Sequence, residues 1–157
     1  MNALFRKMNY KDQTVLHVIN SPESFKPALA EMLETVTVKD TLAKARTVSF
    51  FLAFVTRKSQ VDDLAQVVAP LLEPAGLLWF AYPKGSSRKY KCDFNRDNGW
   101  KKLGELGFEG VRMVAIDEDW SALRFKKAEH IKSMTRSFAM SEQGKKKVEV
   151  LKSSKEE

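Results

Sequence analysis

A short basic turn contains the residues whose types best suit ligand chemistry. The apolar run LLWFAYP at 77–83 is followed directly by Lys84, Gly85, Ser86, Ser87 and Arg88. Successive backbone N–H groups in a glycine-serine turn, with cations beside them, suit phosphate or carboxylate groups. The residue order is not that of a P-loop, which needs a glycine followed by lysine and then serine or threonine. The turn is therefore a candidate anion site, and a solvated surface loop is the alternative.

Two further polar positions follow strand-like segments. Asn20 and Ser21 end and follow the apolar segment TVLHVIN, and Asp40 ends the segment ETVTVKD. An acidic residue about twenty positions after the first strand holds ribose hydroxyls in dinucleotide-type sites. The alternative is that Asp40 caps a helix over 41–45. Because ligands of open α/β sheets bind beyond the carboxyl ends of the strands, we expect a small anionic or nucleotide ligand near Asn20, Asp40 and Lys84.

The remaining reactive side chains favour structural roles. Cys92 follows Lys91, a cation that favours a thiolate, but no histidine close in the sequence serves as its base. His17 lies among apolar neighbours and is expected in the core. The acidic run 117–119 is typical of an exposed hairpin turn, so no metal site is predicted.

Composition indicates one folded, soluble domain. The chain has 157 residues, of which 43% are hydrophobic and 30% charged, and a single cysteine rules out an intramolecular disulfide. No signal peptide or membrane-length apolar run is present, so a cytoplasmic protein without membrane contact is expected. The net charge of +7 raises the alternative of a basic nucleic-acid-binding protein. The basic residues gather in one loop and near the C-terminus, a distribution more typical of solvated surface, so nucleic acid is not the favoured partner.

The pattern of apolar runs predicts elements that place these residues at one edge of a sheet. Strands are expected at 14–20, 34–40, 47–55 and 77–83, helices at 21–33, 59–72 and 95–108, and a hairpin from strands at 111–116 and 122–126. Runs that are apolar on both faces indicate parallel strands covered by helices. The fold class is therefore a three-layer, Rossmann-like α/β domain over 1–127, with a mostly parallel sheet and a C-terminal antiparallel hairpin. Residues 128–157 are expected to form a helical segment and a basic, partly disordered tail.

Residues 14 to 127 resemble the class I methyltransferases. In that class, leucine, proline and glycine often precede a hydrophobic strand and a proline-lysine pair, as in LLEPAGLLWFAYPKG here. More narrowly, the chain resembles the bacterial domain of unknown function family 3052, a family of short methyltransferase-like proteins with no agreed activity. Its most specific matches are Pro83-Lys84-Gly85 and Asp119-Trp120-Ser121. The resemblance implies that Asp119, Trp120 and Ser121 fix the hairpin turn.

The departures from the methyltransferase pattern concern the cofactor. The class carries a Gly-x-Gly-x-Gly turn after its first strand to seat S-adenosylmethionine, whereas this chain reads VINSPESF there. After the third strand it reads VTRKSQ and lacks the Asn-Pro-Pro-aromatic motif of the amino-methylating enzymes. The favoured hypothesis is a ligand-binding or interaction module without conventional methyltransferase activity. The alternative is a divergent S-adenosylmethionine-dependent enzyme.

Overall fold

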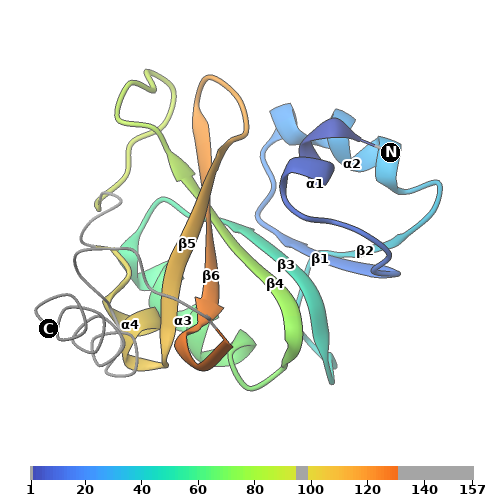
Figure 1. Cartoon of the computed structure of the whole chain (residues 1–157). Helices are drawn as coiled ribbons and strands as arrows, with labels where there is room; N and C mark the ends of the chain where they lie inside the picture. The colour runs from blue at the N-terminus through green and yellow to red at the C-terminus, as the bar shows by residue number, and fades with distance from the viewer. Residues whose placement is uncertain (1, 95–98, 131–157) are drawn as a thin grey trace, which may run out of the picture.

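Six β-strands form one sheet in the order β2-β1-β3-β4-β6-β5, within the residues 2–94 and 99–130 that the computed structural model describes. They are β1 (Val15–Ile19), β2 (Thr37–Lys39), β3 (Val48–Phe54), β4 (Leu72–Pro83), β5 (Phe108–Ala115) and β6 (Trp120–Lys127). The strands from β1 to β4 pair in parallel, and β6 is antiparallel to both of its neighbours, β4 and β5. Five strands therefore share one direction, and the chain closes in a hairpin (Figure 1).

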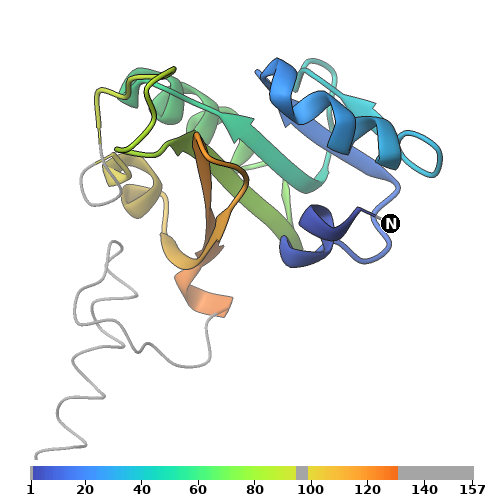
Figure 2. The same cartoon turned by 90° about the horizontal axis from the view of Figure 1, so that it is seen from above.

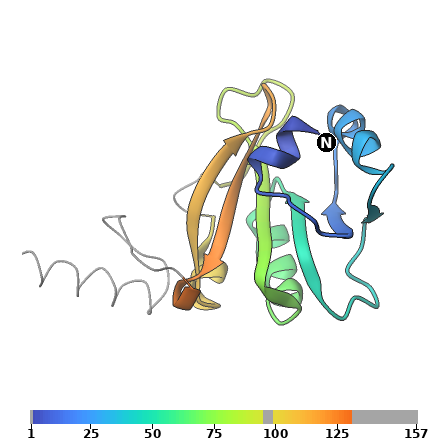
Figure 3. The same ribbon diagram turned by 45° about the vertical axis from the view of Figure 1, so that its right-hand side comes forward.

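Short helices cover both faces of this sheet. They are α1 (Ala3–Lys7), α2 (Lys26–Met32), α3 (Lys58–Val68) and α4 (Lys101–Glu105), with 3₁₀ turns η1 (Glu23–Phe25) and η2 (Ala128–His130). Figures 2 and 3 show α1 and α2 on one side of the sheet and α3 and α4 on the other. The predicted three-layer α/β class, mostly parallel with an antiparallel hairpin, is confirmed.

The two faces of the sheet build two hydrophobic cores. Alternate side chains of β3 show the division, because Phe50, Leu52 and Phe54 face α1 and α2, whereas Phe51 and Ala53 face α3. We call the first the α1-side core and the second the α3-side core. Burying a phenylalanine or leucine completely contributes about 1.5–3 kcal/mol, and all five side chains are fully or almost fully buried. These strands are apolar on both faces because both faces are covered.

The N-terminal layer differs from the sequence prediction. The segment 21–33 does not form one helix from Ser21, because η1 comes first and α2 begins at Lys26, with Pro27 in its first turn, where the missing N–H is tolerated. Helix α1 was not predicted. Asn2 caps it by accepting hydrogen bonds from the backbone N–H groups of Leu4 and Phe5, at 2.9 and 3.3 Å.

Strand β4 also starts earlier than predicted. Helix α3 ends at Val68, and β4 begins at Leu72 and includes Pro74 and Gly76. The register with β3 jumps at this point: Val48 pairs with Leu72, and Phe50 pairs with Leu77. The intervening residues bulge out of the sheet, and a bulge is where a proline in an interior strand is tolerated.

The C-terminal half contains the predicted hairpin and a shorter helix than predicted. Helix α4 has only five residues, and the predicted start of this helix, at residue 95, lies outside the described residues. The predicted C-terminal segment 128–157 also lies outside them, except for η2. Within the described ranges, no helix is long and apolar enough to cross a membrane.

Candidate functional site

The order of strands reverses between β1 and β3 at the carboxyl edge of the sheet. From β1 the chain passes to β2 on one side and then returns to β3 on the other. Ligands of open α/β sheets bind at such a switch point. Asn20 and Ser21 follow β1 at this edge, and Val55 and Thr56 follow β3. Two of the residues predicted from the sequence therefore occupy the expected place.

The turn after β1 is made by asparagine instead of glycine. Asn20 has φ 57°, a left-handed conformation that glycine adopts most readily and that asparagine tolerates. Pro22, two residues later, offers no N–H group. The residues present do not reproduce the glycine-rich turn that seats S-adenosylmethionine in class I methyltransferases. Asn20 and Pro22 let the chain turn after β1, but they do not let a ligand approach the backbone as closely as glycine does.

A row of aromatic side chains fills the α1 side of the same edge. The ring of Phe25 lies 4.9 Å from that of Phe54, which lies 5.1 Å from Trp120, and Trp120 lies 4.8 Å from Tyr90. Phe25, Phe54 and Trp120 are at most 3% exposed. These rings join η1, the end of β3, the start of β6 and the loop after β4. On this side of the switch point, the space next to the turn of Asn20 is packed with side chains.

Asp40 lies at the edge without a structural partner. It follows β2 directly, is exposed, and makes no hydrogen bond or ion pair with any residue in the described ranges. The alternative expectation, that it caps a helix over 41–45, is wrong, because the described chain forms turns there. The side chain that bonds the local backbone is that of Thr41, whose hydroxyl accepts from the N–H of Ala43 at 3.1 Å.

Asp40 and Lys84 are well separated along the edge. Strands β2 and β4 are three positions apart in the sheet, which corresponds to about 14 Å at the usual strand spacing. Asn20 lies between them, because β1 pairs with β2 on one side and β3 on the other. The predicted residues share one edge of the sheet, but Asp40 and Lys84 do not form one compact cluster.

The loop from Lys84 to Phe94 is held by hydrogen bonds within the loop and to two other segments, the hairpin turn and the start of α3. The Lys84 N–H donates to the Asp119 carbonyl at 2.8 Å, and the Ser87 hydroxyl donates to the Asp119 carboxylate at 2.8 Å. The Ser87 hydroxyl also accepts from the Tyr90 N–H at 3.1 Å. At the far end, the Asp93 carboxylate accepts from the N–H of Lys58 at 2.7 Å, at the start of α3. Ser87 thus organises the loop and the hairpin turn.

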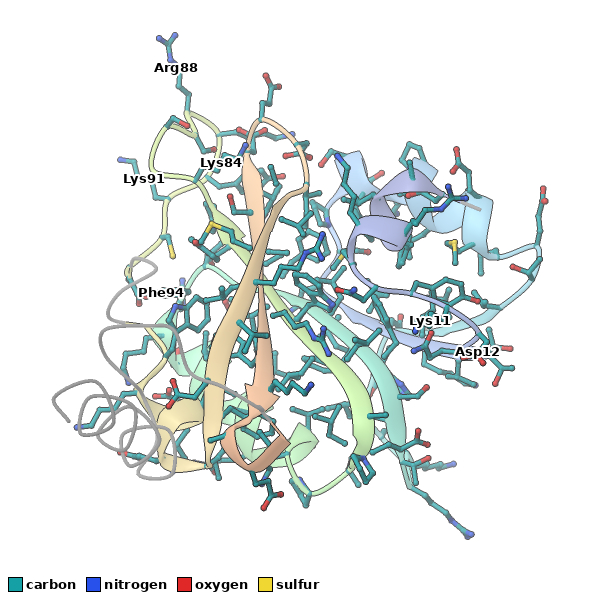
Figure 4. The ribbon with its side chains drawn as sticks, viewed as in Figure 1. Lys11, Asp12, Lys84, Arg88, Lys91 and Phe94 are labelled. Carbon is teal, nitrogen blue, oxygen red and sulfur yellow. The ribbon has the colours of Figure 1, made fainter. Side chains whose placement is uncertain are left out.

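This loop and the strand ends beside it enclose an open pocket of about 630 Å³. Its lining consists of Tyr82, Pro83, Lys84, Gly85, Ser87, Tyr90, Lys91, Cys92, Phe94, Met113 and Ser121. Neither the Lys84 nor the Lys91 ammonium group pairs with an acidic side chain in the described part of the chain. Figure 4 shows Lys84 beside the hairpin, while Arg88 points away from the body of the protein. The pocket therefore combines aromatic walls with unpaired positive charge.

The Cys92 thiol lies in the lining of this pocket, where its surroundings favour the protonated form. Burial raises the pKa of its thiol, the backbone N–H of Phe94 acts in the opposite direction, and the Asp93 carboxylate raises it further. The expectation that neighbouring lysine favours the thiolate is therefore wrong. Desolvation of the half-buried sulfur outweighs the cation next to it in the sequence.

His17 is buried in β1 on the α3 side of the sheet, as expected for a core residue. Burial lowers the pKa of its imidazole, and the neighbouring Lys39 lowers it further. Its Nδ1 atom has no hydrogen-bond partner among the described residues. Within residues 2–94 and 99–130, no group of three or more histidine, cysteine, aspartate or glutamate side chains is arranged to hold a metal ion.

The pocket brings together Lys84, Gly85 and Ser87 of the predicted residues, whereas Ser86 is exposed outside its lining. Sequence reasoning missed Lys91, Tyr90 and Phe94 as pocket residues. The basic character of the loop pointed to Lys91 in the sequence. The positions of the Tyr90 and Phe94 rings could not be predicted, because they depend on where the loop folds back across the end of β3. Ser121 also faces the pocket, and Trp120 belongs to the aromatic row.

Comparisons with known proteins identify the fold. No protein-family model matches this sequence, and no curated protein matches it. Among solved structures, a candidate type 11 methyltransferase from Sulfolobus solfataricus superposes with a TM-score of 0.52 and 8% identity, over 87% of this chain and 94% of that one. TrmN from Thermus thermophilus superposes with a TM-score of 0.50 and 13% identity, over 80% of this chain and 47% of TrmN, so this chain spans about half of that protein. At these identities the similarity shows the fold alone, and the fold is that of the methyltransferases.

Proposed function

We propose that this chain is a ligand-binding module built on the methyltransferase fold, and that it binds a small anionic or nucleotide ligand in the pocket of the Lys84–Phe94 loop. The open pocket of about 630 Å³ carries the proposal, because it combines tyrosine and phenylalanine side chains with two lysines that form no ion pair among the described residues. Its volume lies within the range of small-molecule sites, about 300–1,000 Å³. The pocket also lies just beyond the carboxyl end of β4, where ligands of such sheets bind.

The side chains of the pocket suit a ligand with a flat ring and a negative charge. Tyr90 and Phe94 provide aromatic surface for a base or another planar group. Lys84 and Lys91 provide point charges for phosphate or carboxylate oxygens. Gly85, at the tip of the turn, has open space around it, so a ligand can approach the backbone there.

Conventional methyl transfer is not part of this proposal. The asparagine turn after β1 lacks the glycines of the cofactor seat, and the row from Phe25 to Trp120 packs against the same edge. We also propose that the chain acts in the cytoplasm and is a member of the domain of unknown function family 3052. The resemblance at Pro83-Lys84-Gly85 and Asp119-Trp120-Ser121 supports this membership.

Calorimetric titration of the full chain with ATP, and separately with S-adenosylhomocysteine, tests the proposal. We expect saturable binding of ATP, weakened about tenfold in Lys84→Gln and in Lys91→Gln, the loss that corresponds to one charge-assisted hydrogen bond. Lys11→Gln is the matched control, because Lys11 lies in the N-terminal segment away from the loop (Figure 4). Absence of ATP binding, or equal weakening by Lys11→Gln, would contradict the proposal.

A divergent S-adenosylmethionine-dependent methyltransferase is the second candidate. It is favoured by the exposed, unpaired carboxylate of Asp40 directly after β2, at the position of a ribose-binding acid. This candidate requires binding of S-adenosylhomocysteine and its loss in Asp40→Ala. Asp12→Ala, which removes an exposed carboxylate from the N-terminal segment, is its control. S-adenosylhomocysteine binding that depends on Asp40 would favour this candidate over the first.

A further inference from the structure

Two arginines stand directly opposite each other on the hairpin. Arg112 of β5 and Arg124 of β6 are register partners in the antiparallel pair. Two residues further along both strands, Val114 and Ala122 are also partners and belong to the α1-side core. Because side chains alternate along a strand, both arginines point to the face of α1 and α2. Directly opposed residues of this kind have their Cβ atoms about 4.5–5.5 Å apart.

The arginine pair lacks an acidic partner. Neither guanidinium forms an ion pair or a hydrogen bond with any residue in the described ranges. The Nε atom of Arg124 is buried and has no acceptor. Burial lowers the pKa of Arg124, and the positive charge of Arg112 lowers it further, which agrees with two cations held close together. Buried donors are nearly always satisfied in folded proteins, so the buried Nε–H of Arg124, which finds no acceptor among the described residues, requires an explanation.

The surroundings of the pair are defined on three sides. Trp79 is the register partner of Arg124 on β4, and its indole N–H donates to the Met8 carbonyl at 3.1 Å. The chain after α1 therefore borders the pair on the β4 side. Gly110 and Phe125 are the next partners along the hairpin, and Glu109 and Lys126 follow them. Glu109 is buried. Figures 1 and 3 show the hairpin on the other side of β4 from α1 and α2.

We propose that Arg112 and Arg124 form a binding site for a phosphate group, on the opposite face of the hairpin from the loop pocket. Each guanidinium presents a planar fork of N–H donors that matches two oxygens of a tetrahedral oxyanion. A phosphate between the two forks accepts hydrogen bonds from both residues, including the buried Nε–H of Arg124. Its negative charge also removes the repulsion between the two cations.

Titration of the full chain with inorganic phosphate, followed by NMR of the arginine Nε–Hε signals, tests this site directly. Ionic strength is held constant with sodium chloride so that only specific binding moves the signals. We expect the Arg124 signal, assigned by its loss in Arg124→Lys, to shift saturably. We expect the affinity to fall about tenfold in Arg112→Lys, which keeps the charge but loses the fork. Phenyl phosphate is titrated in parallel, and tighter binding than that of inorganic phosphate would identify a phosphate monoester as the ligand.

Arg46→Lys is the matched control, because Arg46 lies in an exposed turn far from the hairpin and should leave the affinity unchanged. Thermal unfolding in phosphate-free buffer verifies that each variant is folded. Three outcomes would overturn the proposal: an Arg124 signal that does not move, an equal loss of affinity in Arg46→Lys, or equally tight binding of acetate. None of these outcomes bears on ATP binding in the loop pocket, which rests on different residues.

Discussion

Acidic side chains in the hairpin turn accept hydrogen bonds that hold the turn in place. One carboxylate oxygen of Asp117 accepts from the N–H groups of Asp119 and Trp120, at 2.8 and 2.9 Å, and the other accepts from the Ser24 hydroxyl at 3.4 Å. The Asp119 carboxylate accepts from Ser87. Acidic residues of this kind commonly close turns by bonding the backbone two residues on. Asp117 therefore closes the hairpin turn, and Asp119 joins the turn to the loop after β4.

His17 should make stability depend on pH. Its pKa is lowered in the folded state below the ordinary value of 6.5, so the unfolded chain binds more protons as the pH falls. Stability is therefore complete above about pH 6.5 and decreases as the pH falls below it, until the folded pKa is passed. Urea unfolding between about pH 5 and 8 should show this slope in the wild type and a shallower one in His17→Gln. Identical slopes in both proteins would show that His17 is not responsible.

At the scale of elements, the loop after β4 depends on the hydroxyl of Ser87. Ser87→Ala removes a hydrogen bond to a carboxylate and the acceptor of the Tyr90 N–H. We expect the free energy of unfolding to fall by about 1–2 kcal/mol, and amide exchange of Tyr90 to accelerate. Ser86→Ala is the matched control, because Ser86 is exposed and makes no hydrogen bond within the described ranges. If both variants behave alike, the hydroxyl of Ser87 does not hold the loop.

Gly76 lies within β4 and Gly85 follows it, and the two glycines should differ in their tolerance of a side chain. At Gly76 a Cβ atom would lie 2.7 Å from the Leu72 side chain and 2.9 Å from the Glu73 carbonyl, whereas at Gly85 it would meet nothing within 4 Å. Gly76→Ala should therefore destabilise the protein by about 1–3 kcal/mol by straining the bulge. Gly85→Ala should leave stability within about 1 kcal/mol of the wild type. Urea unfolding of the two variants measures this difference. Equal free energies of unfolding in Gly76→Ala and Gly85→Ala would argue against the bulge geometry.

At the scale of the whole molecule, both cores share one sheet and should unfold together. Trp79 and Trp120 report on the α1-side core, and Trp100 reports on the α3-side core. We expect circular dichroism and tryptophan fluorescence to give one coincident urea transition. In a Trp100→Phe background, Val61→Ala on α3 should lower the free energy of unfolding by about 2 kcal/mol by either probe, although the remaining tryptophans lie across the sheet. A fluorescence midpoint that does not move would show that the two layers unfold independently.

The sequence by itself determined the fold class and the positions of its strands. The runs at 14–20, 47–55 and 77–83 predict β1, β3 and most of β4, because only strands covered on both faces are apolar throughout. The acidic turn between two strand-like runs predicts the hairpin. These features are local, so spacing and residue type are sufficient to identify them. For the same reason, the sequence was sufficient to identify Lys84, Gly85 and Ser87 as residues that follow the end of a strand.

Only the tertiary structure decided which residues meet. Tyr90 and Phe94 line the pocket because the loop folds back over β3, and Phe25 and Phe54 pack together from segments with no local relation in the sequence. Arg112 and Arg124 are opposed because a bulge at residues 110–112 sets the hairpin register, and a shift of one residue would place one of them on the other face. The register of the strands, the path of the loop and the choice of packing partners depend on the free energy of the whole fold. The pattern of residues along the sequence is therefore not sufficient to predict them.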